Sequence, residues 1–354
     1  MDNYISPTLI AHLRSEAAEA EKIGRLTNNQ LATIYREKWF NIFVPKTYGG
    51  LALDLLEGLK LEECLAWIDG SLGWTVTLCA GANLFVGYLD PKLAQALFKA
   101  GDVCLGGSGK TSGIAKVIPG GFLLNGEWSY ATGAPHNTAF TANCVIAENG
   151  TMKRDAYGEP IIKSFLFLRD EVSVLNDWDA MGLKATASHT FKVNDLILTG
   201  DRSFVIDNRF PLIDETIYQY PFLQFAETTL AVNVLGMAKR FLALCAEQFA
   251  EIKEQGRLPE TTRYLLDEAW IKTNAISALF YESVGRSWAD FRGGNRTETL
   301  LQEVSSVSKR MVKTLQSQVC LLYPHCGMLA AKQTTEINRV WRNIFTASQH
   351  NLLI

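Results

Sequence analysis

The chain has 354 residues, of which 47% are hydrophobic and 20% charged, and its formal net charge is -3 at pH 7. This balance is typical of a folded protein with two or three structural units, and it excludes a disordered chain. The nearly neutral charge provides no basic surface for nucleic acid or an anionic membrane, so we expect neither as a partner. The first residues carry acids and no apolar signal core, which favours a cytoplasmic protein.

Helices are expected from the start of the chain to about residue 100. Leu31, Ile34 and Tyr35 recur at helical spacing, and Thr27 with Asn28 forms a plausible helix start. The run 44–50 contains Pro and two Gly, so it is expected to form a turn. Residues 70–89 carry no charge but include four glycines. We expect a buried helix pair there, because a membrane span requires roughly 20 predominantly apolar residues.

Residues 101–205 have a different character, with frequent glycines and short apolar runs bounded by turn residues. This pattern predicts a small antiparallel sheet. The runs cover residues 121–126, 144–147, 164–168 and 190–193.

From about residue 206 to 354 the sequence predicts a four-helix bundle. One expected helix has an apolar stripe at helical spacing, formed by Val304, Val307, Met311, Leu315, Val319 and Leu322. Helices, a β domain and then a bundle predict a mostly α protein with an inserted β domain, divided at 1–100, 101–205 and 206–354.

The seven cysteines are dispersed, at Cys64, Cys79, Cys104, Cys144, Cys245, Cys320 and Cys326. No Cys-x-x-Cys pair occurs, so the spacing predicts neither a zinc site nor a thioredoxin-like pair, and we expect no metal. An odd, scattered set is typical of reduced thiols in a cytosolic protein.

Four motifs, in order and at the expected spacing, resemble those of the acyl-CoA dehydrogenase superfamily. They are the VPxxYGG turn at 44–50, the D-x-S-x-x-W helix start at 69–74, the strand at 124–133 and the loop MGLKATAS at 181–188. The resemblance covers nearly the whole chain and implies the three-part fold, a bound flavin and a homotetramer.

In this superfamily the flavin ring lies between the β domain and the bundle. The resemblance implies that Trp128 and Tyr130 contact the flavin and that Thr132 lies beside its N5 atom, where a donor tunes hydride chemistry. For both aromatic residues, a place in an ordinary strand core is the alternative. Ser108 and Thr111 match a stretch that lies against the flavin. The same stretch is no phosphate loop, because Cys104 occupies the position of a required glycine.

Acyl-CoA dehydrogenases need a carboxylate base, and here the matching position falls on or beside Asn351. An amide cannot serve as that base. Some members carry their base on the first bundle helix instead, where Glu227 lies within about one residue of the matching position. The alternative for Glu227 is a surface or capping role.

A string from Thr346 to His350 resembles the two-component flavin monooxygenases of the same superfamily. Members carry a W-S-x-A/S-S-G strand followed by a His, which His136 matches, and a second His near the chain end, which His350 matches. The resemblance implies that a separate reductase supplies reduced flavin and that a His activates the substrate. Histidine suits this task because its pKa lies near neutrality.

Three functions remain open from the sequence. The first is a monooxygenase acting on a small aromatic or hydrophobic substrate, with His350, Thr132 and His136 as catalytic residues. The second is an acyl-CoA dehydrogenase with an atypical base, and the third is a non-catalytic relative. The cofactor is FAD or FMN, because the turn 324–328 keeps only one of the glycines that hold FAD in dehydrogenases.

Overall fold

The N-terminal part is helical in the computed structural model, which describes residues 5–354. Its helices are α1 (Pro7–Ile23), α2 (Asn28–Arg36), α3 (Leu55–Ile68), α4 (Gly70–Asn83) and α5 (Pro91–Phe98). The expected start at Thr27 is confirmed. The Thr27 side chain accepts from the Gln30 backbone N–H, and the Gln30 side chain accepts from the Thr27 N–H. The expected turn is the short 3₁₀ helix η2 (Lys46–Tyr48).

The charge-free segment is buried, as predicted. It forms α4 followed by the 3₁₀ helix η3 (Leu84–Gly87), so the expected second helix is only one short turn. Asp69 caps α4 by accepting from the Leu72 backbone N–H at 2.8 Å. Glycines allow close packing here, because a Cβ at Gly73 would overlap the backbone of Ala66 on α3.

Eight strands form one sheet in the order β6-β7-β2-β1-β3-β5-β8, with β4 paired to β3. Their bounds are β1 (Leu105–Ile118), β2 (Gly121–Ala131), β3 (Ala139–Glu148), β4 (Thr151–Met152), β5 (Ile162–Leu168), β6 (Ser173–Leu175), β7 (His189–Thr199) and β8 (Ser203–Phe204). The prediction of an antiparallel sheet was wrong in one respect, because β1 and β3 pair in parallel. After β2 the chain crosses the beginning of β1 through residues 132–138 and enters β3 on the far side.

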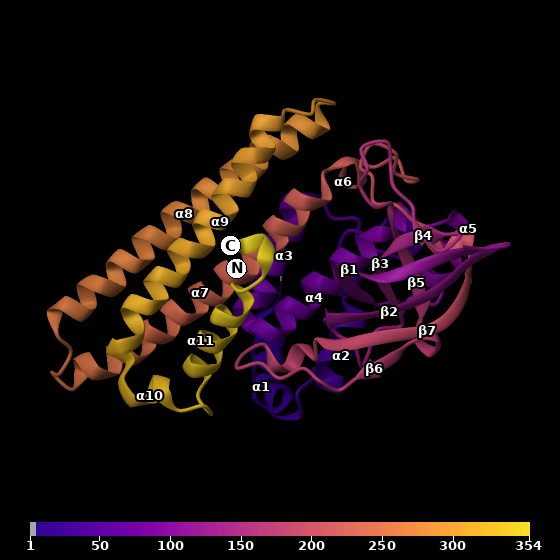
Figure 1. Ribbon diagram of the computed structural model, residues 1–354. Coiled ribbons are helices and arrows are strands. Elements are labelled where there is room, and N and C mark those ends of the chain that lie inside the picture. Colours follow the sequence, from indigo (N-terminus) through magenta and orange to yellow (C-terminus); the bar gives the residue numbers. More distant parts are fainter. Residues whose placement is uncertain (1–4) are drawn as a thin grey trace.

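The C-terminal part contains the expected long helices. They are α7 (Phe222–Glu254), α8 (Glu260–Arg292), α9 (Glu298–Leu322) and α11 (Glu336–Ala347), with the short α6 (Thr216–Gln219) and α10 (Gly327–Ala331) between them. All six stripe residues predicted on α9 are buried. Figure 1 shows the long helices lying alongside one another on one side of the molecule and the sheet on the other, with α3 and α4 between them.

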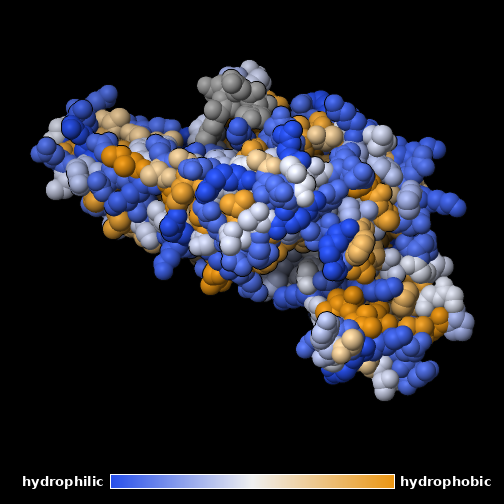
Figure 2. Space-filling model, turned by 90° about the horizontal axis from the view of Figure 1, so that it is seen from above, coloured by the Kyte–Doolittle hydropathy of each residue, from blue (hydrophilic) through white to orange (hydrophobic). Residues whose placement is uncertain are grey.

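One helix, α7, is long and apolar enough to cross a membrane, but 78% of its most apolar window is buried inside the fold. The helical parts share one apolar core, and a second core fills the β domain. On the face shown in Figure 2, hydrophilic residues predominate and hydrophobic residues form smaller patches between them.

Candidate active site

A cavity of about 370 Å³ opens where α4, β1, β3 and α7 meet the end of the chain. Much of its wall is apolar, with Leu78, Phe85, Ile206, Phe222, Phe225 and Leu230. Its polar groups are neutral and include Thr77, Ser108, Thr132, Asn143, Ser164 and His350. Over residues 5–354 the lining includes no Asp, Glu, Lys or Arg. The cavity therefore suits an uncharged, largely apolar ligand.

A β-bulge brings Thr132 to this cavity. The pairing of β2 with β7 shifts between Trp128 and Ala131, and Tyr130 adopts a left-handed backbone with φ of 70°. Regular alternation would point Trp128 and Tyr130 to the same face of the sheet. The bulge separates them, so that Trp128 is fully buried, Tyr130 is 61% exposed and Thr132 lines the cavity.

The Thr132 hydroxyl belongs to a chain of three hydroxyl groups. It lies 2.9 Å from the Ser188 Oγ, which in turn lies 2.7 Å from the Thr186 Oγ1. Thr186 donates to the Leu183 carbonyl at 2.8 Å, which fixes the direction of the chain at its far end. Because all three side chains are buried, each hydroxyl is held in place by its neighbour.

The loop that carries two of these hydroxyls is bent by two strained residues. Leu183 and Ala187 both have positive φ values, of 52° and 44°, on either side of the 3₁₀ turn η5 (Lys184–Thr186). Left-handed backbone costs energy for residues other than glycine and is found where the surroundings impose it. Here the Gly133 N–H donates to the Thr186 carbonyl at 2.8 Å, which joins the loop to the end of β2.

Helix α11 holds the same loop from the other side. Arg342 donates to the Met181 carbonyl at 2.6 Å, and Asn343 accepts from the Leu183 N–H at 2.7 Å. The close contact requires Gly182, because a Cβ there would overlap the Arg342 carbonyl. The helix that leads to His350 and the loop that bonds to Thr132 are therefore locked together.

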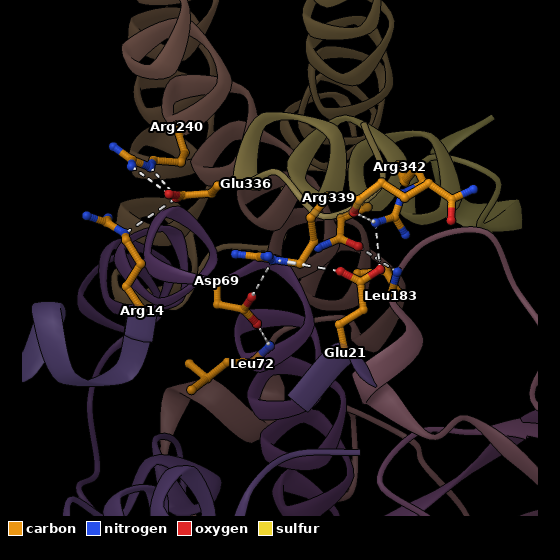
Figure 3. A network of polar contacts seen from close by, with 11 residues as sticks. Arg14, Glu21, Asp69, Leu72, Leu183, Arg240, Glu336, Arg339 and Arg342 are labelled. Carbon is orange, nitrogen blue, oxygen red and sulfur yellow. Dashed lines mark hydrogen bonds and ion pairs between the residues drawn. The ribbon is translucent and has the colours of Figure 1, made fainter. Parts of the chain in front are cut away.

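Ion pairs anchor α11 to the N-terminal helices, as Figure 3 shows. Arg342 pairs with Glu21 of α1 at 2.6 Å, and Arg339 lies 3.9 Å from the buried Asp69 at the start of α4. At the other end of α11, Glu336 accepts two hydrogen bonds from Arg240 of α7, at 2.7 and 3.0 Å. These contacts join segments 96 to 321 residues apart around the helix that positions the candidate catalytic histidine.

His350 lies just beyond α11, at the start of the 3₁₀ helix η8 (Asn351–Leu353), and lines the cavity. The Leu352 N–H donates to its Nδ1 at 3.3 Å, and its ring packs edge-on against Trp74. Since Nδ1 accepts, the neutral ring carries its proton on Nε2 and presents that N–H as a donor. Burial lowers the pKa of His350 below its ordinary value, because it disfavours the charged ring.

Of the residues singled out from the sequence, Ser108, Thr132 and His350 meet at the cavity. Thr111 is exposed and lies beyond an irregularity in the pairing of β1 with β3, away from the lining. Tyr130 lies on the surface, with Lys110 over its ring at 4.5 Å and Trp178 edge-on to it.

The structure does not bring Trp128 to the cavity. Its indole packs against Phe167 and Phe191 in the β-domain core, and its N–H donates to the Asn143 carbonyl at 3.1 Å. Trp128 therefore lies in an ordinary strand core, which was the alternative to a flavin contact. Asn143 itself lines the cavity, so Trp128 supports the wall from behind.

His136 also lies outside the cavity lining. Its ring stacks on Phe40, and its Nε2 is buried without a hydrogen-bond partner among residues 5–354. Its imidazole instead faces the thiols of Cys79 and Cys104. Its position on the sequence, shortly after a cavity residue, does not place its side chain in the cavity.

Glu227 is on α7 but does not line the cavity, although its neighbour Ala226 does. Its side chain is only 3% exposed, and one carboxylate oxygen has no partner among the described residues. The surface role considered for it is therefore wrong, and the structure does not bring it to the site as a base.

Thr77 lines the cavity and was not singled out from the sequence, whereas His189 was noted in a loop at the edge of the pocket and does not line it. Thr77 accepts from the Asn233 side chain at 2.7 Å, which links the cavity wall of α4 to α7. His189 accepts at Nδ1 from the backbone N–H groups of Asp177 and Trp178. It therefore shapes the segment beside Tyr130. The charge-free run of α4 was the only signal for Thr77.

Comparisons with known proteins find similar chains and one matching family model. The family model for the acyl-CoA dehydrogenase C-terminal domain matches residues 228–353. Indole-3-acetate monooxygenase from Pseudomonas putida is 24% identical, over 80% of this chain and 72% of its own. The flavin-dependent monooxygenase oxygenase subunit HsaA from Mycobacterium tuberculosis is 25% identical, over 97% of this chain and 89% of its own.

Solved structures share the fold. The HsaA monooxygenase from M. tuberculosis matches with a TM-score of 0.90 at 20% identity, covering 98% of this chain and 93% of that one. XiaF from Streptomyces sp., solved in complex with FADH2 and glycerol, matches with a TM-score of 0.87 at 20% identity. That match covers 98% of this chain and 89% of XiaF.

Proposed function

Since the chain is a flavin-dependent oxidoreductase with the acyl-CoA dehydrogenase fold, and the proteins similar to it are flavin-dependent monooxygenases, we propose that it is the oxygenase component of a two-component system. Its partner in this proposal is a separate flavin reductase. The observation that carries it is a mainly apolar cavity with a histidine and no carboxylate.

The donor set of the cavity fits a flavin. Ser108, Thr132 and Asn143 offer neutral hydroxyl and amide groups, which suit the ring's carbonyl and nitrogen atoms. Gly109 also lines the cavity, and a Cβ there would meet nothing within 4 Å, so the wall is open along the β1 backbone. Reduced flavin, when bound, supplies the electrons that activate oxygen. The residues do not discriminate FAD from FMN.

Thr132 and His350 have separate tasks in this proposal. The direction of the hydroxyl chain makes Thr132 donate to Ser188, so its lone pairs remain to accept a hydrogen bond from an N–H at the flavin edge. His350 donates its Nε2–H to an oxygen or nitrogen of the substrate and stabilises negative charge that develops there. The apolar side chains around them exclude water from the reacting atoms.

The substrate we propose is a small, uncharged aromatic compound. Phe85, Phe222 and Phe225 give one part of the cavity an aromatic surface, which suits a small aromatic ring. A cationic substrate would find no carboxylate partner in this wall. An acyl-CoA dehydrogenase reaction has no support here, since Glu227 does not line the cavity and His350 is the titratable group that does.

The test supplies the purified protein with reduced FAD or FMN from an unrelated reductase under ¹⁸O₂, with a panel of phenols and indoles. One ¹⁸O atom in a product, found by mass spectrometry, is the expected result. His350→Asn should slow hydroxylation by about 10²-fold. The matched control is His12→Gln, because His12 is exposed on α1, away from the cavity lining.

A second pair of variants examines Thr132. Thr132→Val keeps the shape but removes the hydroxyl, so product formation should fall by about 10²-fold while hydrogen peroxide release rises. Thr132→Ser should retain most of the product. Bleaching of tightly bound FAD by an acyl-CoA, without any hydroxylated product, would instead identify a dehydrogenase. Failure to bind flavin in any form would identify a non-catalytic relative.

We further propose a homotetramer in the cytoplasm. The bundle carries exposed apolar side chains, among them Ile271 on α8, Leu321 on α9 and Met328 on α10. Such residues on one helical part suit contacts between subunits. Light scattering after gel filtration should give four times the 39.3 kDa chain mass; a monomer would contradict the assembly.

A further inference from the structure

A second group of reactive side chains lies outside the cavity lining. Cys79 of α4, Cys104 just before β1 and His136 of the crossing between β2 and β3 bring one ligand atom each within 4.8 Å of the other two. Both thiols are completely buried. Cys104 follows Cys79 by 25 residues, and His136 follows Cys104 by 32. These separations fit no metal-binding motif, so the spacing of the cysteines predicted no metal site.

A fourth atom points into the same space. The side-chain oxygen of Asn137 accepts hydrogen bonds from the Cys104 Sγ at 3.3 Å and from the Cys79 Sγ at 3.7 Å. Its direction is fixed, because the Asn137 amide nitrogen donates to the Thr132 carbonyl at 3.0 Å. A tetrahedron of zinc ligands has edges of about 3.3–3.8 Å, given zinc–ligand bonds of about 2.0–2.3 Å. The two measured separations lie within a few tenths of an ångström of those edges.

The surroundings hold the His136 ring and the Asn137 oxygen beside the two thiols. His136 stacks on Phe40 with ring centroids 5.6 Å apart, and its buried Nε2 has no hydrogen-bond partner among residues 5–354. A Cβ on Gly133 would stand 2.8 Å from that nitrogen and 2.9 Å from the Asn137 oxygen. Gly133 is therefore needed both for its φ of 76° and for the room it leaves.

From this geometry we infer that Cys79, Cys104, His136 and Asn137 form a buried site for a divalent zinc-like ion. Thiolates and imidazole both suit zinc, and the Asn137 amide oxygen would take the fourth position. A bound ion would satisfy the unpartnered His136 nitrogen and neutralise the thiolates.

The site would have a structural role, because a bound ion would hold together three segments behind the cavity. Cys79 comes from the N-terminal helical part, Cys104 from the entry to the sheet, and His136 and Asn137 from the chain that follows Thr132. The Cys79 Sγ also lies 3.8 Å from the Thr132 carbonyl oxygen. An ion here would tie α4 to the residues that position the Thr132 hydroxyl, without itself touching the substrate.

Cobalt is the probe for the test, since tetrahedral Co²⁺ bound to thiolates absorbs strongly in the visible and near ultraviolet. The full-length protein, freed of metal with a chelator and kept reduced, is titrated with Co²⁺ before flavin is added. We expect one Co²⁺ per chain, a tetrahedral thiolate spectrum and its loss on adding one equivalent of Zn²⁺. Elemental analysis of protein grown with zinc should find one zinc per chain.

Variants separate this site from adventitious binding. Cys104→Ser and His136→Ala should each weaken Co²⁺ binding by at least tenfold, whereas Cys320→Ser should leave it unchanged because Cys320 is exposed on α9. A wild-type protein that shows no thiolate–cobalt spectrum overturns the proposal whatever the variants do. So does a spectrum that persists in both site variants. A disulfide between Cys79 and Cys104 in wild-type protein that binds no metal would assign the pair to thiol oxidation instead.

Discussion

At the residue scale, the proposed role of His350 requires that its imidazole ring is neutral. Burial lowers its pKa, so the group is neutral at pH 7 and becomes charged only below its ordinary value of about 6.5. Protonation would put a hydrogen on Nδ1, where the Leu352 N–H now donates. The ring would then lose the contact that orients it, and activity should fall on the acid side.

This gives a prediction for the pH profile of kcat/KM. The acid limb of the wild-type enzyme should have an apparent pKa below about 6.5, and this limb should vanish in His350→Asn. Because the folded pKa is the lower one, His350 stabilises the fold fully above about pH 6.5 and less as the pH falls. An acid limb that persists in the variant would assign the titration to another group.

A second buried group, Glu62 on α3, should have the opposite effect on how the stability of the fold depends on pH. It is completely buried, both carboxylate oxygens lack a hydrogen-bond partner among the described residues, and its pKa is raised well above the ordinary value. Burial is the main cause, opposed by the nearby Thr77 hydroxyl. The carboxyl group is therefore neutral in the folded protein and ionises on unfolding, so its contribution is complete below about pH 4.5 and is lost as the pH rises.

Glu62→Gln removes that titration and keeps the shape. The free energy of unfolding of the variant, relative to the wild type, should rise with pH above about 4.5, by at most about 1.4 kcal/mol for each pH unit. Urea denaturation at several pH values measures this slope. A constant difference between the two proteins would show that Glu62 is already ionised in the fold.

At the scale of elements, α11 connects the site to the rest of the molecule. Arg342 pairs with Glu21 and donates to the Met181 carbonyl, and both side chains of the ion pair are mostly buried. Removing one member of such a pair leaves the other without compensation, which costs about 3–5 kcal/mol. The loop 181–188 loses its contact at the same time.

Arg342→Ala should therefore lower the free energy of unfolding by about 3 kcal/mol and expose the loop 181–188 to proteases. Urea denaturation and limited proteolysis with mass spectrometry measure the two effects. The control is Arg209→Ala, whose ion pair with Asp207 is largely exposed and should contribute less than about 1 kcal/mol. Equal losses in both variants would contradict the role given to the α11 contacts.

Elements were predictable from the sequence where the pattern is local. The α9 stripe and the Thr27 helix start are such cases, because both depend on neighbours within one or two turns. The parallel pairing of β1 with β3 was missed, because pairing depends on which strands meet in space and not on the apolar pattern of each. The glycine-rich start of β1 further hides its strand character.

At the scale of the whole molecule, the site was predicted only in part. Thr132 and His350 are 218 positions apart and were found through motifs, and the structure brings both to the cavity. The position of a residue within a motif does not determine the direction in which its side chain points. The bulge at Tyr130 turns that residue outward, Trp128 packs inside the sheet, and His136 faces two cysteines. These outcomes depend on backbone geometry and long-range packing.

The parallel pairing of β1 and β3 also bears on how such a protein can change. It obliges the chain to pass over the beginning of β1, and the seven residues 132–138 that do so lie outside the named strands. Substitutions there can alter chemistry without shifting the register of a strand. Thr132, Gly133, His136 and Asn137 all lie on this crossing, so the proposed flavin contact and the proposed ion site share one segment that no strand register constrains.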